Sequence, residues 1–211
     1  MKLYKRLLQD IGVLLSYFWT LNTSAKWKRF KAHVYTGYLK RSFFSLGSGT
    51  TIDCYAANLK GLSSVKVGER SHLGKNIQLT VWNTNEANRK APVIVIGDDC
   101  NIRENAHITA INKIHIGNHL LTGTNILITD NAHGVSEYHQ LLLPPSERKL
   151  STKGEIRIGN NVWLGNNVCI LSGVSIGDGC IIAANSVVTK DIPSFCVAAG
   201  VPAKIIKQCN E

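Results

Sequence analysis

The chain has 211 residues, of which 44% are hydrophobic and 18% charged, so disordered and fibrous classes are excluded and one globular domain is expected. Its six cysteines, at positions 54, 100, 169, 180, 196 and 209, contain no CxxC pair, which excludes a zinc module or disulfide framework and favours a cytoplasmic protein. The net charge of +10 is concentrated in residues 1–45, with nine Lys or Arg and one acid, so a nearly neutral body with no nucleic-acid binding is expected.

Residues 1–45 are predicted to form a basic, amphipathic helical arm, because apolar residues recur on one helical face at Leu3, Leu7, Ile11, Leu14 and Phe18. The apolar run from Ile11 to Leu21 is shorter than the ~20 residues that span a membrane. Three interpretations stay open for this arm: a signal peptide, a helix that packs on its own domain, and a peripheral membrane-binding segment at the inner face of the membrane.

From residue 46 to residue 192, aliphatic residues recur every six positions, as in Ile96, Ile102 and Ile108. Smaller residues that should also point inward follow four positions later: Cys100, Ala106, Ile126, Ala132, Val162, Val168, Val174, Cys180 and Ser186. Gly, Asn or Asp then come at the corners, where they tolerate positive φ. The pattern predicts a mainly β protein, a parallel β-helix in which Cys100 and Cys180 fill the core.

Three interruptions break this period, and interruptions in a solenoid usually host a binding surface. The first inserts WNTNEANRKAP after Val81, the second lies at Asn112 and Lys113, and the longest is a loop over residues 134–157. His133 stands where the regular coil gives way to that loop, so it is expected at a corner rather than in the core.

Two stretches carry a family resemblance. Residues 158–207, IGNNVWLGNNVCILSGVSIGDGCIIAANSVVTKDIPSFCVAAGVPAKIIK, resemble the closing coils and tail of acetyl-CoA-dependent sugar O-acetyltransferases, and residues 193–211 would be that C-terminal tail. Residues 116–154, IGNHLLTGTNILITDNAHGVSEYHQLLLPPSERKLSTKG, resemble the branch that acts on cell-surface polysaccharides and lipopolysaccharides. The resemblance implies a left-handed parallel β-helix of hexapeptide repeats with an extruded active-site loop.

The resemblance also implies an activity: direct transfer of acetyl from acetyl-CoA to a hydroxyl of a sugar or cell-surface glycan precursor, with no metal. His133 would be the general base, a role that suits a neutral imidazole. Asn105, Asn112 and Asp130 would bind the acceptor, although Asn and Asp also form corner turns by themselves. Arg148 would either hold an anionic group of the acceptor or order the loop.

The resemblance places the cofactor on the closing coils. Asn166 and Ala184 would contact the pantetheine arm, and Trp163 would lie beside the thioester and the acceptor. Contacts near the phosphates are implied at Thr189, Lys190, Lys204 and Lys207, since phosphates favour cationic partners. The sequence Ala183–Ala184–Asn185 departs from the family's usual Gly-Ala-Gly at this point.

Active sites of this kind lie between subunits, so a homotrimer is implied. Three alternatives stay open: acetylation of a xenobiotic such as an antibiotic, a non-catalytic scaffold, and a zinc-dependent hydratase on the same fold. His115 and His119 would be the ligands of such a zinc site, but their spacing of four residues points them in different directions on a coil.

Overall fold

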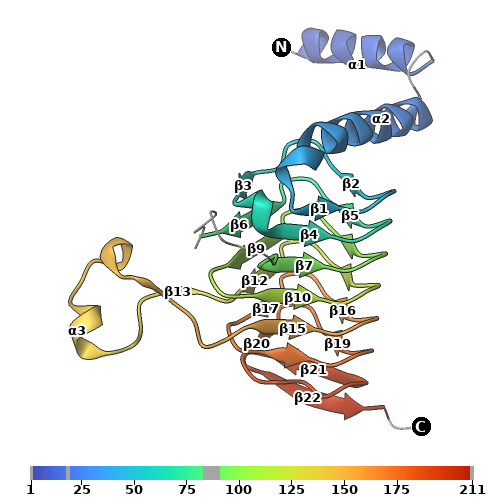
Figure 1. Ribbon diagram of the computed structural model, residues 1–211. Helices are drawn as coiled ribbons and strands as arrows, with labels where there is room; N and C mark the ends of the chain where they lie inside the picture. The colour runs from blue at the N-terminus through green and yellow to red at the C-terminus, as the bar shows by residue number, and fades with distance from the viewer. Residues whose placement is uncertain (1, 18–19, 83–90, 210–211) are drawn as a thin grey trace.

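The computed structural model describes residues 2–17, 20–82 and 91–209. Two helices, α1 (Lys2–Ser16) and α2 (Leu21–Leu39), precede a triangular stack of β-coils, and a long loop leaves the stack to one side (Figure 1). Phe18, which the sequence placed on the apolar helical face, lies outside the described residues, as does most of the first insertion.

Three sheets form the sides of the triangle, and their strands run parallel except for the last pair, β21 and β22. Sheet 1 contains β1 (Ser45–Leu46), β4 (Val65–Val67), β7 (Ile94–Ile96), β10 (Ile114–Ile116), β15 (Ile156–Ile158) and β18 (Ser175–Ile176). Sheet 2 contains β2 (Thr51–Ile52), β5 (His72–Leu73), β8 (Asn101–Ile102), β11 (Leu121–Thr122), β16 (Trp163–Leu164), β19 (Ile181–Ile182), β21 (Cys196–Gly200) and β22 (Ala203–Gln208). Sheet 3 contains β3 (Asn58–Lys60), β6 (Gln78–Val81), β9 (His107–Ala110), β12 (Leu127–Thr129), β17 (Cys169–Ile170) and β20 (Val187–Val188).

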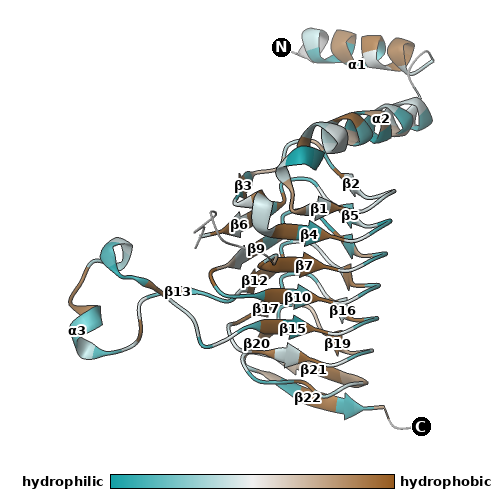
Figure 2. Ribbon diagram, viewed as in Figure 1, coloured by the Kyte–Doolittle hydropathy of each residue, from teal (hydrophilic) through white to brown (hydrophobic). Residues whose placement is uncertain are grey.

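The six-residue period becomes a set of buried ladders along the stack. Ile116 pairs with Ile96 on one side and with Ile158 on the other, and all three side chains are buried. Figure 2 shows the hydrophobic strands one above another. Cys100 and Cys180 are buried as predicted, and burial raises the pKa of both thiols, so they stay neutral and act as small apolar side chains.

One inward assignment is wrong. Ala132 is exposed, because the chain has already left the coil at this point and forms β13 (Ala132–His133). The six-residue pattern does not predict that departure, because it contains no information on the direction in which the chain continues.

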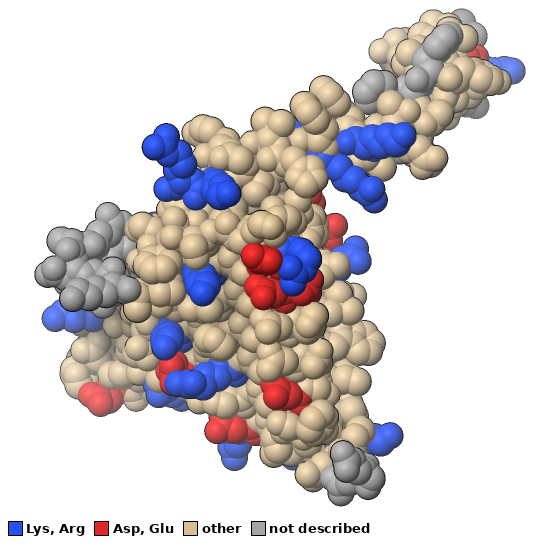
Figure 3. Space-filling view, turned by 45° about the vertical axis from the view of Figure 1, so that its right-hand side comes forward, with Lys and Arg blue, Asp and Glu red and all other residues tan. Residues whose placement is uncertain are grey.

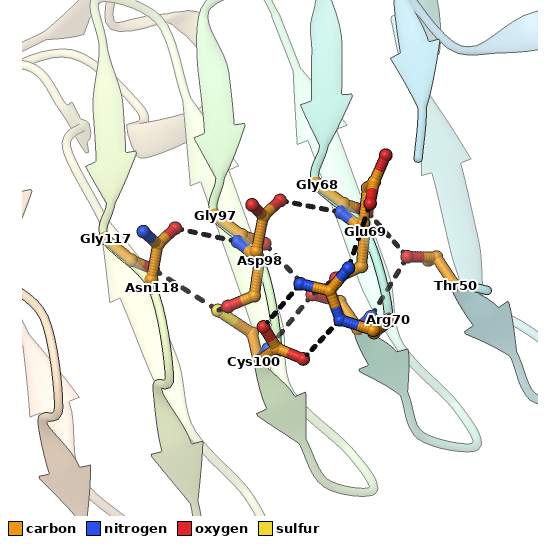
Figure 4. Close-up of polar contacts among 11 residues, drawn as sticks. Thr50, Gly68, Glu69, Arg70, Gly97, Asp98, Cys100, Gly117 and Asn118 are labelled. Carbon is orange, nitrogen blue, oxygen red and sulfur yellow. Dashed lines mark hydrogen bonds and ion pairs between the residues drawn. The ribbon is translucent and has the colours of Figure 1, made fainter. Parts of the chain in front are cut away.

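Glycines allow the coils to approach at the corner between sheets 1 and 2, which we call the glycine corner (Gly47, Gly68, Gly97, Gly117, Gly159 and Gly177). A Cβ on Gly97 would lie 2.5 Å from the carbonyl oxygen of Gly117. Polar side chains link neighbouring coils here: the Glu69 amide donates to Asp98 Oδ1 at 2.7 Å, and the Asp98 amide donates to Asn118 Oδ1 at 2.9 Å (Figure 4).

Asparagines turn the chain between sheets 2 and 3, at what we call the asparagine corner (Asn76, Asn105, Asn125, Asn167 and Asn185). All five have positive φ, a backbone conformation that Asn tolerates. Their side-chain amides also bond to one another from coil to coil, for example Asn76 Nδ2 to Asn105 Oδ1 at 3.0 Å. The remaining corner, between sheets 3 and 1, hosts the interruptions, and we call its described residues the loop corner (residues 82, 91–93, 111–113, 130–155, 171–174 and 189–191).

The two helices of the arm behave differently. α2 packs on the first coil: buried Thr36 donates to the Ala32 carbonyl at 2.7 Å and accepts the Ile52 amide at 2.8 Å. In α1, every side chain described, from Tyr4 to Ser16, is exposed. The helix lies beyond α2, away from the coils (Figure 1). In the described part of the chain, no helix is long and apolar enough to cross a membrane.

Candidate active site

His133 stands at the neck of the long loop. It lies on β13, which pairs antiparallel with β14 (Leu150–Ser151), so the two chains of the neck are tied together where they leave the stack (Figure 1). The Ser151 hydroxyl also donates to the Gly134 carbonyl at 2.6 Å. The His133 side chain is exposed, and the neck therefore presents an imidazole away from its own coil.

The loop beyond the neck contains a short helix, α3 (Tyr138–Leu141), and a 3₁₀ turn (Pro145–Glu147). Arg148 holds this loop together, because Nε donates to the Leu143 carbonyl at 2.9 Å and Nη2 donates to the Leu141 carbonyl at 3.2 Å. Of the two roles left open for Arg148, these contacts support ordering of the loop.

Asp130 is fully buried just before the neck, where its carboxylate accepts three backbone N–H groups. Oδ1 binds the amide of Ile111 at 2.8 Å, and Oδ2 binds those of Asn112 and Lys113 at 2.9 and 2.8 Å. The expected contact between Asp130 and the acceptor conflicts with this burial, and the residue instead fixes the turn below the neck. Asn112 is exposed at the same corner.

Asn105 is not beside His133. It belongs to the asparagine corner, where its Oδ1 accepts from Asn76 and its Nδ2 donates to Asn125 at 2.9 Å. Strand β9 separates it from the loop corner, so within one chain Asn105 lies away from His133, and its assignment to the acceptor stays a prediction. The six-residue period predicts that a corner recurs, but it does not tell which of the three corners a given polar residue occupies.

A groove of about 750 Å³ runs along sheet 2 towards the asparagine corner. It brings together Trp163, Asn166 and Ala184, which the sequence assigned to the cofactor. The Asn166 Oδ1 accepts the Thr124 amide at 2.9 Å, so part of this side chain holds neighbouring coils together. The Trp163 side chain is exposed and available to a ligand.

Sequence reasoning missed other residues that line this groove: Arg103, Leu121, Thr124 and Ile181. A signal was present for two of them, because Leu121 and Ile181 pair with Trp163 on the outward-facing row of sheet 2. Apolar residues at three successive outward positions indicate a surface that meets a ligand or another chain.

The residues expected near the cofactor phosphates fall in two places. Lys204 and Lys207 lie on β22, at the end of sheet 2, and both are exposed. Thr189 lines a second cavity, of about 480 Å³, at the loop corner beside Gly134 and Ser151, and the neighbouring Lys190 is exposed.

The groove and the imidazole lie at different corners of the triangle. Thr124 lines the groove, and Asp130 lies at the loop corner. The chain between these two residues runs along the whole sheet 3 side of the triangle. At about 3.3 Å per residue, this separation is about 20 Å. Groups that far apart are not within hydrogen-bond distance of each other in one chain.

The histidines considered for zinc occupy separate surfaces: His115 faces outward from sheet 1, and His119 forms a turn with φ 58°. Partial burial, with nearby Arg157 and Lys113, lowers the pKa of His115. Within the three described stretches, no group of three or more His, Cys, Asp or Glu side chains is placed to hold a metal ion.

Comparison with known proteins places the chain in a family. The family described as bacterial transferase hexapeptide (six repeats) matches residues 155–190. A putative lipopolysaccharide biosynthesis O-acetyl transferase WbbJ of Escherichia coli K12 is 35% identical over 74% of this chain and 76% of its own length. The galactoside O-acetyltransferase of the same organism is 35% identical over 55% of this chain and 64% of its own length.

Among solved structures, a galactoside acetyltransferase in complex with coenzyme A has 26% identity and a TM-score of 0.52, covering 82% of this chain and 69% of its own. The fold is a left-handed parallel β-helix with an N-terminal helical region, as the pattern and the family resemblance together implied. The chain therefore belongs to the hexapeptide-repeat acetyltransferases, which are acyltransferases that use acetyl-CoA.

Proposed function

We propose that the protein transfers acetyl from acetyl-CoA to a hydroxyl of a sugar or cell-surface glycan precursor, with His133 as general base. The observation that carries this proposal is the exposed imidazole at the tied neck of a loop that leaves the stack. The curated relatives, whose printed names are lipopolysaccharide and galactoside O-acetyltransferases, support the acceptor class.

The chemistry assigned to His133 is proton removal from the acceptor hydroxyl as its oxygen attacks the acyl carbon. The C–S bond of the thioester then breaks, and the imidazolium returns the proton to the departing coenzyme A thiolate. Acetyl-CoA supplies the activated acyl group when it is bound. The β13–β14 pairing restrains the backbone on both sides of the imidazole, so the base is positioned before the acceptor arrives. Asn112, exposed at the same corner, is assigned to a further hydroxyl of the acceptor.

The groove on sheet 2 suits the cofactor. An extended pantetheine arm needs a long, partly apolar channel, and Trp163 and Ala184 line such a channel together with Asn166. Lys204 and Lys207, at the end of the same sheet, are assigned to the phosphates of coenzyme A. Thr189 and Lys190, at the loop corner, are assigned to the phosphates of cofactor bound by a neighbouring subunit.

The separation of about 20 Å between groove and base favours a homotrimer in which the loop of one subunit reaches the groove of the next. The outward apolar row on sheet 2 supports the same arrangement: Leu121 and Trp163 are 45% and 50% exposed in the single chain. In a closed ring of three, each cleft takes its groove from one subunit and its His133 from another.

The test of the base is His133→Ala, with His139→Ala as a matched control because His139 is exposed on the same loop. We expect His133→Ala to reduce acetyl transfer to a panel of glycosides by about 10²- to 10⁴-fold, the usual value of general-base catalysis. Coenzyme A affinity should stay unchanged. A loss smaller than about tenfold, or an equal loss in the control, refutes the assignment.

Sites shared between subunits are tested by mixing. Trimers made only of His133→Ala or only of Trp163→Ala chains should be inactive. Trimers refolded from an equal mixture should recover about a quarter of the wild-type sites, since half the loops meet half the grooves. No recovery, or a monomer with full activity in light scattering, contradicts the shared site.

The arm supports a further part of the proposal: peripheral attachment to the inner face of an anionic membrane. In α1, Leu7, Ile11 and Leu14 are exposed on one face, and the helix also carries Lys5 and Arg6. Figure 2 shows both hydrophobic and hydrophilic segments along α1. Each cation near an anionic surface contributes about 1 kcal/mol, and the apolar face adds burial at the interface.

Deletion of residues 1–19 tests the attachment, because it leaves the Thr20 cap of α2 in place. We expect the truncated protein to keep its melting temperature and to stop sedimenting with anionic vesicles. Full-length protein that ignores anionic vesicles at low salt rules out membrane attachment.

A further inference from the structure

Two neighbouring cavities lie where α2 meets the first coils, outside the groove and the loop corner. The larger, about 350 Å³, is lined by Lys28 and Lys31 of α2 and by Lys75 of the second coil. The smaller, about 260 Å³, is lined by Lys28, Arg29 and His33 together with residues of β2 and β5. Because Lys28 lines both, the two cavities form one site, which we call the junction site.

The junction site has an excess of positive charge. Four cations line it against two acids, Asp53 and Glu104. Of these acids, Glu104 already pairs with a cation, since its Oε2 is 3.5 Å from Arg103 Nε, and Asp53 Oδ2 is 3.7 Å from His72 Nε2. Among the residues that the structure describes, no ion-pair partner lies within 4.0 Å of Lys28, Lys31 or Lys75. Figure 3 shows Lys and Arg side chains along the arm where it approaches the coils.

Three lysines that line one cavity match the chemistry of a phosphate, which accepts several charge-assisted hydrogen bonds. Four cations against two acids leave the junction site with a net positive charge, which an anion bound among the lysines would offset. α2 is a firm support for two of the three, since Thr36 anchors the helix to Ile52 on the first coil.

A tyrosine at the mouth of the junction site indicates what accompanies the phosphate. Tyr55 lines the larger cavity, is 71% exposed and has φ 69°, a left-handed conformation that favours Gly or Asn. Later coils use Asn for left-handed residues at this corner. A bulky ring held in an unfavourable backbone conformation beside a cationic cavity suits contact with the apolar face of a sugar.

The junction site and the proposed acetylation groove share one coil of the stack. Arg103 lines the groove and the adjacent Glu104 lines the junction site. Lys75, on the second coil, and Thr122, on the fourth, are two coil spacings apart along the stack, about 10 Å. A short oligosaccharide attached to the phosphate would therefore extend into the groove.

We propose that the junction site binds a glycosyl phosphate, with Lys28, Lys31 and Lys75 on the phosphate and Tyr55 against the sugar. The role of this ligand as the acetyl acceptor depends on the proposed function, whereas its binding does not. The phosphate can belong to a soluble sugar phosphate or to a lipid-linked one.

Calorimetric titration of the full chain with glucose 1-phosphate, in the absence of acetyl-CoA, tests the site. We expect millimolar or tighter binding that unphosphorylated glucose does not reproduce. Lys28→Ala/Lys75→Ala should weaken it at least tenfold, whereas Lys26→Ala, on the same helix but outside both cavities, should leave it unchanged. Equal effects of the two changes, or no binding by the wild type, overturn the proposal.

Two further measurements separate the alternatives. Tyr55→Asn should weaken binding of glucose 1-phosphate without lowering the melting temperature, because Asn accepts the left-handed backbone; unchanged affinity refutes the contact with the sugar. Saturating coenzyme A should not displace glucose 1-phosphate, and displacement would assign the phosphate to the groove instead.

The source of the phosphate is distinguished with the residue 1–19 deletion and neutral phosphatidylcholine vesicles that carry polyprenyl phosphoglucose. Lysine-dependent retention on these vesicles supports a lipid-linked ligand, and binding of glucose 1-phosphate alone supports a soluble one. Acetyl transfer without glucose 1-phosphate binding would overturn the junction site but not the proposed function. Glucose 1-phosphate binding without acetyl transfer would overturn the proposed function but not the junction site.

Discussion

Replacement of Asp130 by alanine should destabilise the protein strongly, because this carboxylate holds the turn beneath the His133 neck. It is fully buried and accepts the amides of Ile111, Asn112 and Lys113 at 2.8 to 2.9 Å. A hydrogen bond to a charged group is worth about 1.5–3 kcal/mol. Residues 112 and 113 are exposed, so water can partly replace the lost acceptor there. The lower end of that range gives about 3–5 kcal/mol for all three bonds.

Urea unfolding of Asp130→Ala measures this loss, with Asp98→Ala as the matched control. Asp98 accepts one amide in an exposed corner, that of Glu69, and should cost about 1 kcal/mol. Asp130→Asn should fall between the two, since an amide oxygen can keep the Ile111 bond while its NH₂ group faces two donors. An Asp130→Ala variant within 1 kcal/mol of the control would mean that the three bonds contribute little.

Three other changes test the fold and the loop. Gly97→Ala should lower the free energy of unfolding in urea by about 1–3 kcal/mol, since the new Cβ meets the Gly117 backbone. Gly37→Ala in α2, where a Cβ meets nothing within 4 Å, should not lower it. Burial lowers the pKa of His107, so protonation of this imidazole favours the unfolded chain. Stability should therefore fall as the pH decreases from about 6.5, the pKa in the unfolded chain, through the pKa in the folded protein. His107→Gln should remove that part of the acid sensitivity in thermal melts. Arg148→Ala should speed proteolytic cleavage within residues 134–157 and leave the melting temperature unchanged. A cleavage rate equal to that of the wild type would contradict the role of Arg148 in ordering the loop.

Much of the architecture could be predicted from local sequence. A coil of six-residue sides repeats its inward positions regularly, so Ile96, Ile116 and Ile158 could be identified as one buried ladder. Glycine and asparagine mark corners because few other residues tolerate those backbone conformations or that close approach. The break in the period also located the neck of the loop at His133, since an interruption is visible without knowledge of what surrounds it.

Only the tertiary structure decided which residues share a corner and which way their side chains point. Asn105 and Asp130 both follow the expected polar pattern, yet one lies in the asparagine corner and the other is buried beneath the neck. The arm divides in the same way: α2 is anchored through Thr36 while α1 stays exposed, although both belong to one basic segment. The physical reason is that the period specifies inward and outward positions within one coil. Contacts between corners, helices and coils depend on how distant segments stack, and that arrangement is not local.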